Sequence, residues 1–407
     1  TTEIYTLSLH DALPILIKQG VTLRATGAVQ LSGDSNVSGS GDSAGSLIEL
    51  YGTIEGQRLS INGYNNNDMV VLTHVAANMP TTIDLGGGDD VLYLGSQATP
   101  TANVGGVVDR MASLLTVIGG GGYDVLNVDD SGDNDDNVGA LTDSTITGLG
   151  MAEGIVYGTI EKIEIDLGGG DDVFNVRSTA AGVDATVASG DGDDVFNVSS
   201  DAPGLAGNLD AIRGDLHIDA GSGANTLNVS DRGNDAGRTG VVIDEHSVAG
   251  LGDSGGGAVT FAPEGGFSGG LNFWFGNGND EVTVIGAMPD AATTLAMGGG
   301  NDQVTLRDES GVVDGLVIVI GEGGDDAING AAWTSGLALF GDNGQIAWQD
   351  GKSPDSLASL TASAGEDDGN DALIGGSGDD VIFGGGGNDA VTRSEERRVG
   401  KECRSRW

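Results

Sequence analysis

The stretch that decides the fold is a pair of consecutive nine-residue units, GGSGDDVIF at 375–383 and GGGGNDAVT at 384–392. Both units fit the pattern G-G-x-G-x-D-x-U-x, in which U is an apolar residue. Glycine tolerates positive φ, so the backbone can turn tightly and point its carbonyl oxygens inward. The aspartate adds a carboxylate, and calcium takes about six to eight such oxygen ligands. We therefore expect a calcium-binding turn, followed by a short strand whose apolar side chain enters a core.

This segment resembles haemolysin-type (RTX) calcium-binding repeats. Gly369-Asn370-Asp371 precedes it, so Asp371, Asp380 and Asp389 follow one another at a spacing of nine. In a β-roll each unit is half a coil, which puts Asp371 and Asp389 on one edge and Asp380 on the opposite edge. We expect at most one well-formed nonapeptide site, between the loops of Asp371 and Asp389. The metal-binding residues that the resemblance implies are Gly369, Asp371, Gly375, Gly376, Gly378, Asp380, Gly384, Gly385, Gly387 and Asp389.

Turns of the form G-x-G-x-D-x-U also occur singly upstream of this segment. Their anchor residues, which stand at the aspartate position, are Asp68 in a degenerate copy, Asp90, Asp124, Asp172, Asp194, Asn225, Asp280, Asp302 and Asp326. Two interpretations stay open. In the first, calcium ions bridge stacked loops through Asp90, Asp172, Asp194, Asp280, Asp302 and Asp326. In the second, the turns are solenoid corners in which Gly and Asp only satisfy turn chemistry. Asn225 shows that a carboxylate is not required at every anchor.

The anchors reveal a long internal repeat. They group into the triplets 68–90–124, 172–194–225 and 280–302–326, and the first gap in each triplet is 22 residues. The first anchors are 104 and then 108 residues apart, which indicates a super-repeat of roughly 105 residues present about three times. TDSTITGLG at 142–150 also aligns with DEHSVAGLG at 244–252. After most anchors, two apolar residues flank an Asn or Thr, a period-two pattern that predicts apolar side chains inside and Asn outside.

A coil of this length cannot bury its own apolar face, so successive coils are expected to stack. We predict an all-β fold, a parallel β-solenoid (β-helix) with lateral loops or hairpins that ends in a short RTX β-roll. The solenoid is expected at 16–345, a linker at 346–365 and the β-roll at 366–392. The acidic segments 129–138 and 230–240 are interpreted as loops or lateral hairpins that project from the solenoid. Asp109–Val117 is the best helical candidate, and its periodicity is weak.

The two ends, TTEIYTLSLHDALPI at 1–15 and RSEERRVGKECRSRW at 393–407, resemble translated sequencing-adapter DNA. With suitable codons, DNA encoding the last fifteen residues is the reverse complement of DNA encoding the first ones in another frame. We therefore leave both stretches out of the fold argument. The remaining chain has 11 Lys and Arg, 56 Asp and Glu, and no cysteine, so metal rather than disulfides is expected to stabilise it.

Composition and motifs exclude several function classes. A net charge of −44 opposes direct binding to nucleic acid, because phosphate contacts need Lys and Arg. The sequence has no apolar run of about 18 residues that would span a membrane. GDSGG at 252–256 resembles the nucleophile motif of chymotrypsin-like proteases, but His74, His217 and His246 do not stand in the context of that family's catalytic histidine. We therefore expect no enzymatic activity.

The segment from TGLG at 147–150 to LGGGDDVFNV at 167–176 resembles repeats of long bacterial surface proteins. This resemblance implies a secreted or cell-surface, adhesin-like protein whose structural repeats are stabilised by calcium. The expected partners are calcium and components of the cell surface or extracellular matrix. Two alternatives stay open: a secretion or stability module of an RTX toxin or secreted hydrolase, and a β-helix enzyme acting on polysaccharides. The scarcity of basic residues, which would bind uronates, counts against the β-helix enzyme.

Overall fold

The structure, a computed structural model, describes residues 5–8, 14–33, 45–252, 256–261, 266–309, 315–349, 356–363 and 368–393. The chain divides into two compact units. The first unit comprises Thr1–Gly233 and His246–Leu271, and the second comprises Asn234–Glu245 and Asn272–Trp407. Most of the two stretches expected to derive from adapter DNA lies outside the described residues, although Tyr5–Ser8 forms β1. Residues 253–255 of the GDSGG motif also lie outside them.

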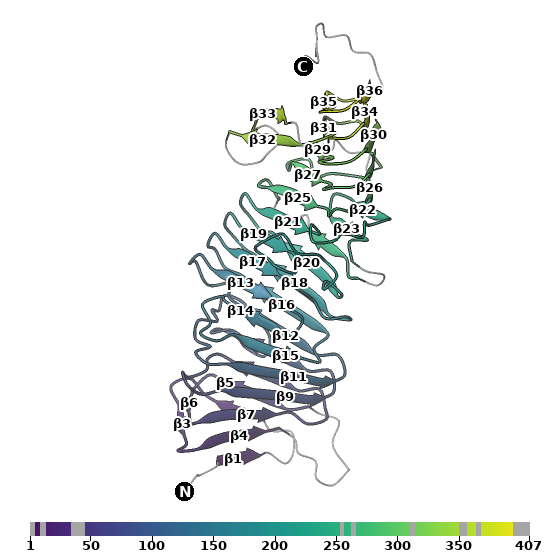
Figure 1. The fold of residues 1–407 in the computed structure, drawn as a ribbon. Coiled ribbons are helices and arrows are strands. Elements are labelled where there is room, and N and C mark those ends of the chain that lie inside the picture. Colours follow the sequence, from purple (N-terminus) through teal and green to yellow (C-terminus); the bar gives the residue numbers. More distant parts are fainter. Residues whose placement is uncertain are drawn as a thin grey trace. The chain divides into compact units, whose positions relative to one another are not determined.

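In the first unit, successive strands alternate between two mostly parallel sheets (Figure 1). One sheet has the order β1 (Tyr5–Ser8), β4 (Ala28–Ser32), β7 (Arg58–Asn62), β9 (Thr81–Gly87), β11 (Leu115–Gly121), β15 (Ile155–Gly158), β14 (Thr145–Thr147), β13 (Val138–Leu141), β17 (Val173–Val176), β19 (Val195–Val198) and β21 (Thr226–Ser230). The other has the order β2 (Ile15–Ile17), β5 (Leu47–Leu50), β8 (Met69–Leu72), β10 (Val91–Leu94), β12 (Val125–Asp129), β16 (Lys162–Asp166), β18 (Asp184–Ala188), β20 (Asp215–Asp219), β24 (Val259–Phe261) and β23 (Ser247–Ala249). β3 (Thr22–Arg24) and β6 (Thr53–Glu55) pair separately. This arrangement confirms the predicted β-solenoid.

Short antiparallel strands interrupt the parallel winding of the first unit. β14 pairs antiparallel with both β13 and β15, and β23 pairs antiparallel with β24. β14 and β23 lie in the two segments, 142–150 and 244–252, that align with each other in the sequence. After the insertion of β14 the anchor turns precede strands of the other sheet: Asp124 precedes β12, whereas Asp172 precedes β17. The super-repeat therefore moves the anchors from one edge of the coil to the other.

The second unit also has two mostly parallel sheets. One contains β25 (Gly270–Trp274), β27 (Thr293–Ala296), β29 (Val317–Ile320), β31 (Leu337–Phe340) and β35 (Val381–Phe383). The other contains β22 (Val241–Ile243), β26 (Glu281–Val284), β28 (Gln303–Arg307), β30 (Ala327–Ala332), β34 (Ala372–Gly375) and β36 (Ala390–Arg393). β34 pairs in parallel with β30, and β35 with β31. The nonapeptide strands therefore extend the same sheets as the preceding coils.

The segment 346–365, which was expected to be a linker, contains most of an antiparallel hairpin. β32 (Gly344–Trp348) pairs with β33 (Leu357–Ala362). Ile346, Trp348 and Leu360 pack against a cluster of buried residues that includes Ile318 and Phe340. Apolar side chains on alternate positions of β32 explain why this segment pairs and packs instead of remaining extended in solvent.

Alternate side chains of the strands fill the core, as the period-two pattern predicts. Phe174 and Phe196 occupy equivalent positions in β17 and β19, and both are almost fully buried. The residues between the apolar positions differ from the prediction, because Asn175 and Asn197 are also buried. The Asn197 side-chain amide donates to Asn175 Oδ1 at 3.1 Å. The asparagine side chains of successive coils thus stack and shield one another from solvent. The sequence pattern of a single strand does not reveal this burial.

None of the described residues forms an α-helix. The helical candidate Asp109–Val117 was wrong: Met111 forms an isolated bridge with Val75, and Leu115–Gly121 is β11. The described residues accordingly contain no helix that is long and apolar enough to cross a membrane.

Replacing Gly122 by alanine tests how strictly the turns require glycine. Gly122 has φ +138°, and a Cβ there would lie 1.9 Å from the carbonyl oxygen of Gly88 in the preceding coil. We expect Gly122→Ala to lower the free energy of unfolding by about 2 kcal/mol or more. Urea unfolding in millimolar calcium, followed by circular dichroism, measures this change. Gly121→Ala is the matched control, because a Cβ at Gly121 meets nothing within 4 Å. Equal stability of the two variants would contradict the expectation.

Candidate metal centre

Each anchor residue ends a glycine turn that stacks directly on the turn of the neighbouring coil. In the turn before Asp124, Gly120 has φ +109°, and a Cβ on it would lie 1.7 Å from the carbonyl oxygen of Gly86. The same close approach recurs in the second unit, where a Cβ on Gly324 would lie 1.9 Å from the carbonyl oxygen of Gly300. Backbone carbonyl oxygens therefore lie between successive turns, in space that side chains would otherwise occupy.

The anchors form three stacked rows, which we call anchor columns. Their members are Asp68, Asp90 and Asp124 in the first; Asn137, Asp172, Asp194 and Asn225 in the second; and Arg238, Asp280, Asp302, Asp326, Asp371 and Asp389 in the third. Within each column, the backbone N–H of one member donates to Oδ1 of the next. The donor–acceptor distance is 3.0 Å from Asp90 to Asp124 and 2.8 Å from Asp302 to Asp326. At the end of the first column, Glu161 accepts the N–H of Asp124 at 2.8 Å.

The acidic segments 129–138 and 230–240 do not only project as loops. Asn137 donates its N–H to Asp172 Oδ1 at 2.8 Å, and Arg238 donates its N–H to Asp280 Oδ1. These two residues begin the second and third columns. The sequence could not show this, because no G-x-G-x-D pattern marks either position.

A second ladder runs along the residues that immediately precede the anchors, and it has the opposite direction. Asp193 donates its N–H to Asp171 Oδ1 at 2.9 Å, and Asn370 donates its N–H to Asp325 Oδ1 at 2.7 Å. Here the side chain accepts from the following coil, whereas in the anchor columns it accepts from the preceding coil. The residues of this second ladder are exposed, so water competes for its hydrogen bonds. The anchor columns are buried, and their hydrogen bonds therefore hold neighbouring coils together more strongly.

The second carboxylate oxygen distinguishes the anchors from ordinary turn residues. Within the described residues, Oδ2 is buried and has no hydrogen-bond partner in Asp90, Asp124, Asp194, Asp302, Asp326 and Asp371. Burial, more than any other cause, raises the pKa of Asp302 to about 8 and that of Asp90 to about 7. The charges of neighbouring anchors contribute to both increases, and the N–H group that each carboxylate accepts opposes them. A buried carboxylate in this state requires a proton or a cation.

The structure places the predicted nonapeptide residues as the β-roll pattern implies. Asp371 donates its N–H to Asp389 Oδ1 at 3.1 Å, so these two residues are neighbours in the third column. Asp380 lies apart from that column and accepts the N–H of Leu337 at 3.2 Å. Of the predicted glycines, Gly369 and Gly387 stack so that a Cβ on Gly387 would lie 1.8 Å from the Gly369 carbonyl oxygen. The loops of Asp371 and Asp389 thus bring carboxylates and carbonyls together.

Asp342 joins these loops and was missed by the sequence analysis. It is 1% exposed, and its carboxylate accepts the N–H groups of Gly369 at 3.0 Å and Gly386 at 2.6 Å. Burial raises its pKa, the two N–H groups lower it, and the charges of Asp368 and Asp389 raise it. The glycines of Gly341-Asp342-Asn343-Gly344 gave a turn signal, but this turn lacks the nonapeptide spacing.

The raised pKa values predict an unusual pH dependence. Between pH 4 and 8 the folded, calcium-free chain binds more protons than the unfolded chain, whose aspartates titrate near 3.8. Lowering the pH from 8 to 5 without calcium is therefore expected to stabilise the fold by about 1 kcal/mol or more. In millimolar calcium we expect the opposite order, because protons displace calcium from the same carboxylates.

Far-UV circular dichroism and thermal midpoints at pH 8 and 5 test this dependence, with light scattering to exclude aggregation. A calcium-free chain that is equally stable at both pH values, or more stable at pH 8, would show that the columns carry no excess protons.

Comparison with known proteins was made for families, curated proteins and solved structures. The RTX calcium-binding nonapeptide repeat matches in four copies, over residues 82–98 and 367–393. The first range contains the Asp90 turn, which stands alone in the sequence, and the second contains Asp371, Asp380 and Asp389. Neither the curated proteins nor the solved structures gave a match. The chain therefore carries RTX calcium-binding nonapeptide repeats, and these repeats imply that it binds calcium.

Proposed function

We propose that this chain is a structural, non-enzymatic solenoid segment of a secreted or cell-surface protein, and that calcium binding drives its folding. The observation that carries the proposal is the set of buried anchor carboxylates, among them Asp90, Asp302 and Asp371, whose Oδ2 atoms have no hydrogen-bond partner among the described residues. The RTX repeats include two members of this set, Asp90 in the first matched range and Asp371 in the second.

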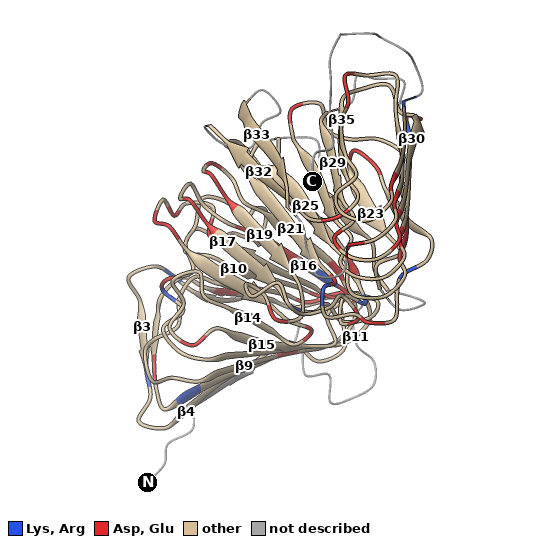
Figure 2. Cartoon of the chain, turned by 45° about the horizontal axis from the view of Figure 1, so that its top comes forward, with Lys and Arg blue, Asp and Glu red and all other residues tan. Residues whose placement is uncertain are grey.

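Repulsion between carboxylates destabilises the calcium-free fold, and calcium binding removes this repulsion. Figure 2 shows Asp and Glu gathered in the turns between strands, and the whole chain has a net charge of −44. Neighbouring strands in a sheet are about 4.8 Å apart. At that separation, two carboxylates in a medium of effective dielectric constant about 20 repel by about 3 kcal/mol. Several such pairs in one column approach the total stability of a typical domain, about 5–15 kcal/mol. A bound cation replaces this repulsion with attraction.

The proposed location follows from the same argument. A chain that folds only where calcium is abundant remains unfolded where calcium is scarce, and then folds outside the cell. This behaviour suits a protein exported as an unfolded chain. Components of the cell surface or extracellular matrix are its proposed partners, because a rigid repeat segment can hold an adhesive part away from the cell.

A calcium titration of the chain at pH 7.5, from chelator to about 10 mM calcium, tests the folding role. We expect a cooperative change from a coil to a β-sheet spectrum, because each coil stacks only on its neighbours. Sodium chloride at matched ionic strength controls for screening of charge, and magnesium controls for the size of the ion. A β-sheet spectrum that is already complete in chelator would refute calcium-driven folding.

An isosteric substitution separates the two roles of an anchor, which are to accept a backbone N–H group and to bind calcium. Asn keeps the Oδ1 acceptor but lacks the charge, as Asn225 does where it accepts the N–H of Asp194 at 2.9 Å. We expect Asp302→Asn to stabilise the calcium-free chain by about 1 kcal/mol or more and to reduce the stabilisation by calcium. The β-sheet content in chelator measures the first effect, and thermal midpoints at increasing calcium concentration measure the second. The exposed Asp290, replaced by Asn, is the control for net charge. If the two variants respond alike, Asp302 has no role in binding calcium.

A further inference from the structure

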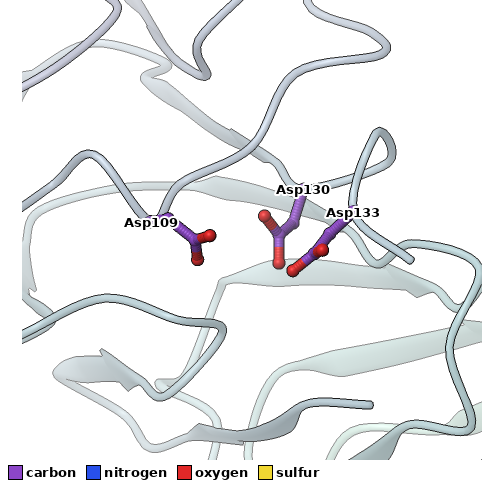
Figure 3. Close-up of side chains that lie close together, drawn as sticks. All are labelled: Asp109, Asp130 and Asp133. Carbon is purple, nitrogen blue, oxygen red and sulfur yellow. The ribbon is translucent and has the colours of Figure 1, made fainter. Parts of the chain in front are cut away.

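Three carboxylates gather outside the anchor columns in the first unit. Asp109, Asp130 and Asp133 each offer an oxygen, and these oxygens all lie within 4.8 Å of one another (Figure 3). Asp109 lies between β10 and β11, whereas Asp130 and Asp133 lie between β12 and β13. Two successive connections of the solenoid therefore meet at this cluster. None of the three residues belongs to a nonapeptide match.

Asp130 is the observation that points to a ligand. Its side chain is 1% exposed, and its Oδ1 accepts the N–H of Val108 at 2.9 Å. Its Oδ2 is buried and has no hydrogen-bond partner among the described residues. Figure 3 shows the Asp130 carboxylate directed toward Asp109 and Asp133. Burial, more than any other cause, raises the pKa of Asp130 to about 7; the Val108 N–H opposes the increase, and the charges of Asp133, Asp109 and Asp172 contribute to it.

Asp133 is held in place before any ion arrives. Its Oδ1 accepts the N–H groups of Asn134 at 2.8 Å and Asp135 at 3.1 Å. Its Oδ2 accepts the side-chain amide of Asn137 at 2.8 Å. Oδ2 accepts one hydrogen bond and keeps a second lone pair, so these hydrogen bonds orient Asp133 and leave Oδ2 able to bind a cation.

Asp109 closes the cluster from the solvent side. It is exposed, and its Oδ1 lies where a Cβ of Gly150 would be, 1.5 Å from that ideal position. The glycine at position 150 therefore makes room for the Asp109 carboxylate. Since Asp109 faces water, solvent can supply the ligands that three carboxylates leave open.

We propose that Asp109, Asp130 and Asp133 bind one calcium ion, at a site separate from the nonapeptide repeats. Carboxylate and water oxygens are hard ligands, and calcium accepts irregular oxygen sets at about 2.3–2.6 Å. Two oxygens on opposite sides of such an ion are about 4.8 Å apart, so the cluster is compact enough for one ion to reach all three carboxylates. The ion clamps the connection before β11 to the connection before β13. Magnesium fits less well, because it demands a near-ideal octahedron with shorter bonds.

The second super-repeat contains an internal comparison. Asp210, Asp231 and Asn234 stand 101 residues after Asp109, Asp130 and Asp133. The backbone contact is repeated there, since the N–H of Leu209 donates to Asp231 Oδ1 at 2.9 Å. An amide replaces the third carboxylate, however. Asp210→Asn is therefore a matched control for Asp109→Asn: it removes the same charge from the equivalent position.

Hydrogen–deuterium exchange of the full chain, resolved by peptide, tests the site. In millimolar calcium, in which the chain is folded, we expect the bound ion to slow exchange in peptides 104–112 and 129–137 on the order of tenfold or more, and magnesium at equal concentration is measured beside it. Asp109→Asn and Asp130→Asn are expected to abolish this protection. Asp109 is exposed, so its variant can fold even if the Asp130 variant does not. Asp210→Asn should leave the protection unchanged.

Peptides covering 369–389 report the nonapeptide repeats in the same experiment, so failure at one site is distinguishable from failure at the other. Protection of 104–112 that persists in Asp109→Asn would overturn the proposal. An equal response to magnesium would overturn the assignment to calcium. Loss of protection in Asp210→Asn as well would show that net charge, not a specific site, is responsible.

Discussion

The hydrogen bond from an anchor N–H to the side-chain oxygen of the next anchor is the interaction on which the coils depend. A solenoid corner must turn the chain within a few residues, and its buried N–H groups must still find acceptors. Strand pairing cannot supply them, because the turn interrupts the ladder. Oδ1 of each anchor replaces the missing acceptor, for example Asp124 at 3.0 Å and Asp326 at 2.8 Å. The glycines before it let the turns approach closely enough for this contact.

This constraint explains why the super-repeat is long. Three members stack in the first column, four in the second and six in the third while the winding stays parallel. In the first unit, β14 then enters antiparallel between β13 and β15, and the anchors continue before strands of the other sheet. A column therefore ends where the direction of winding is disturbed. Glu161 accepts the last N–H of the first column, and Asn137 begins the second.

The sequence predicted the elements that depend on local spacing. The glycine turns, the period-two core and the separation of Asp380 from Asp371 and Asp389 all follow from short-range pattern. The sequence did not predict contacts between residues far apart in the chain, such as Asp342 with Gly386 or Asp109 with Asp130. It also placed the Asn175 and Asn197 side chains outside, because burial by a stacked neighbour is invisible in one strand. The hairpin β32–β33 was missed for a similar reason: its two strands are separated in the sequence by residues of uninformative composition.

Asn225 bears on the choice between a solenoid corner and a cation site. Its Oδ1 accepts the N–H of Asp194, and its amide group donates to the carbonyl of Ala220 at 2.6 Å. An uncharged side chain thus satisfies the corner completely. If the corner were the whole purpose of an anchor, asparagine would serve at every position and would avoid the repulsion between buried charges. At Asp326 and Asp371, aspartate adds a second oxygen that has no hydrogen-bond partner among the described residues, and the charge of Asp371 raises the pKa of Asp326. Both are costs in a cation-free fold and become contributions to stability once a cation is bound.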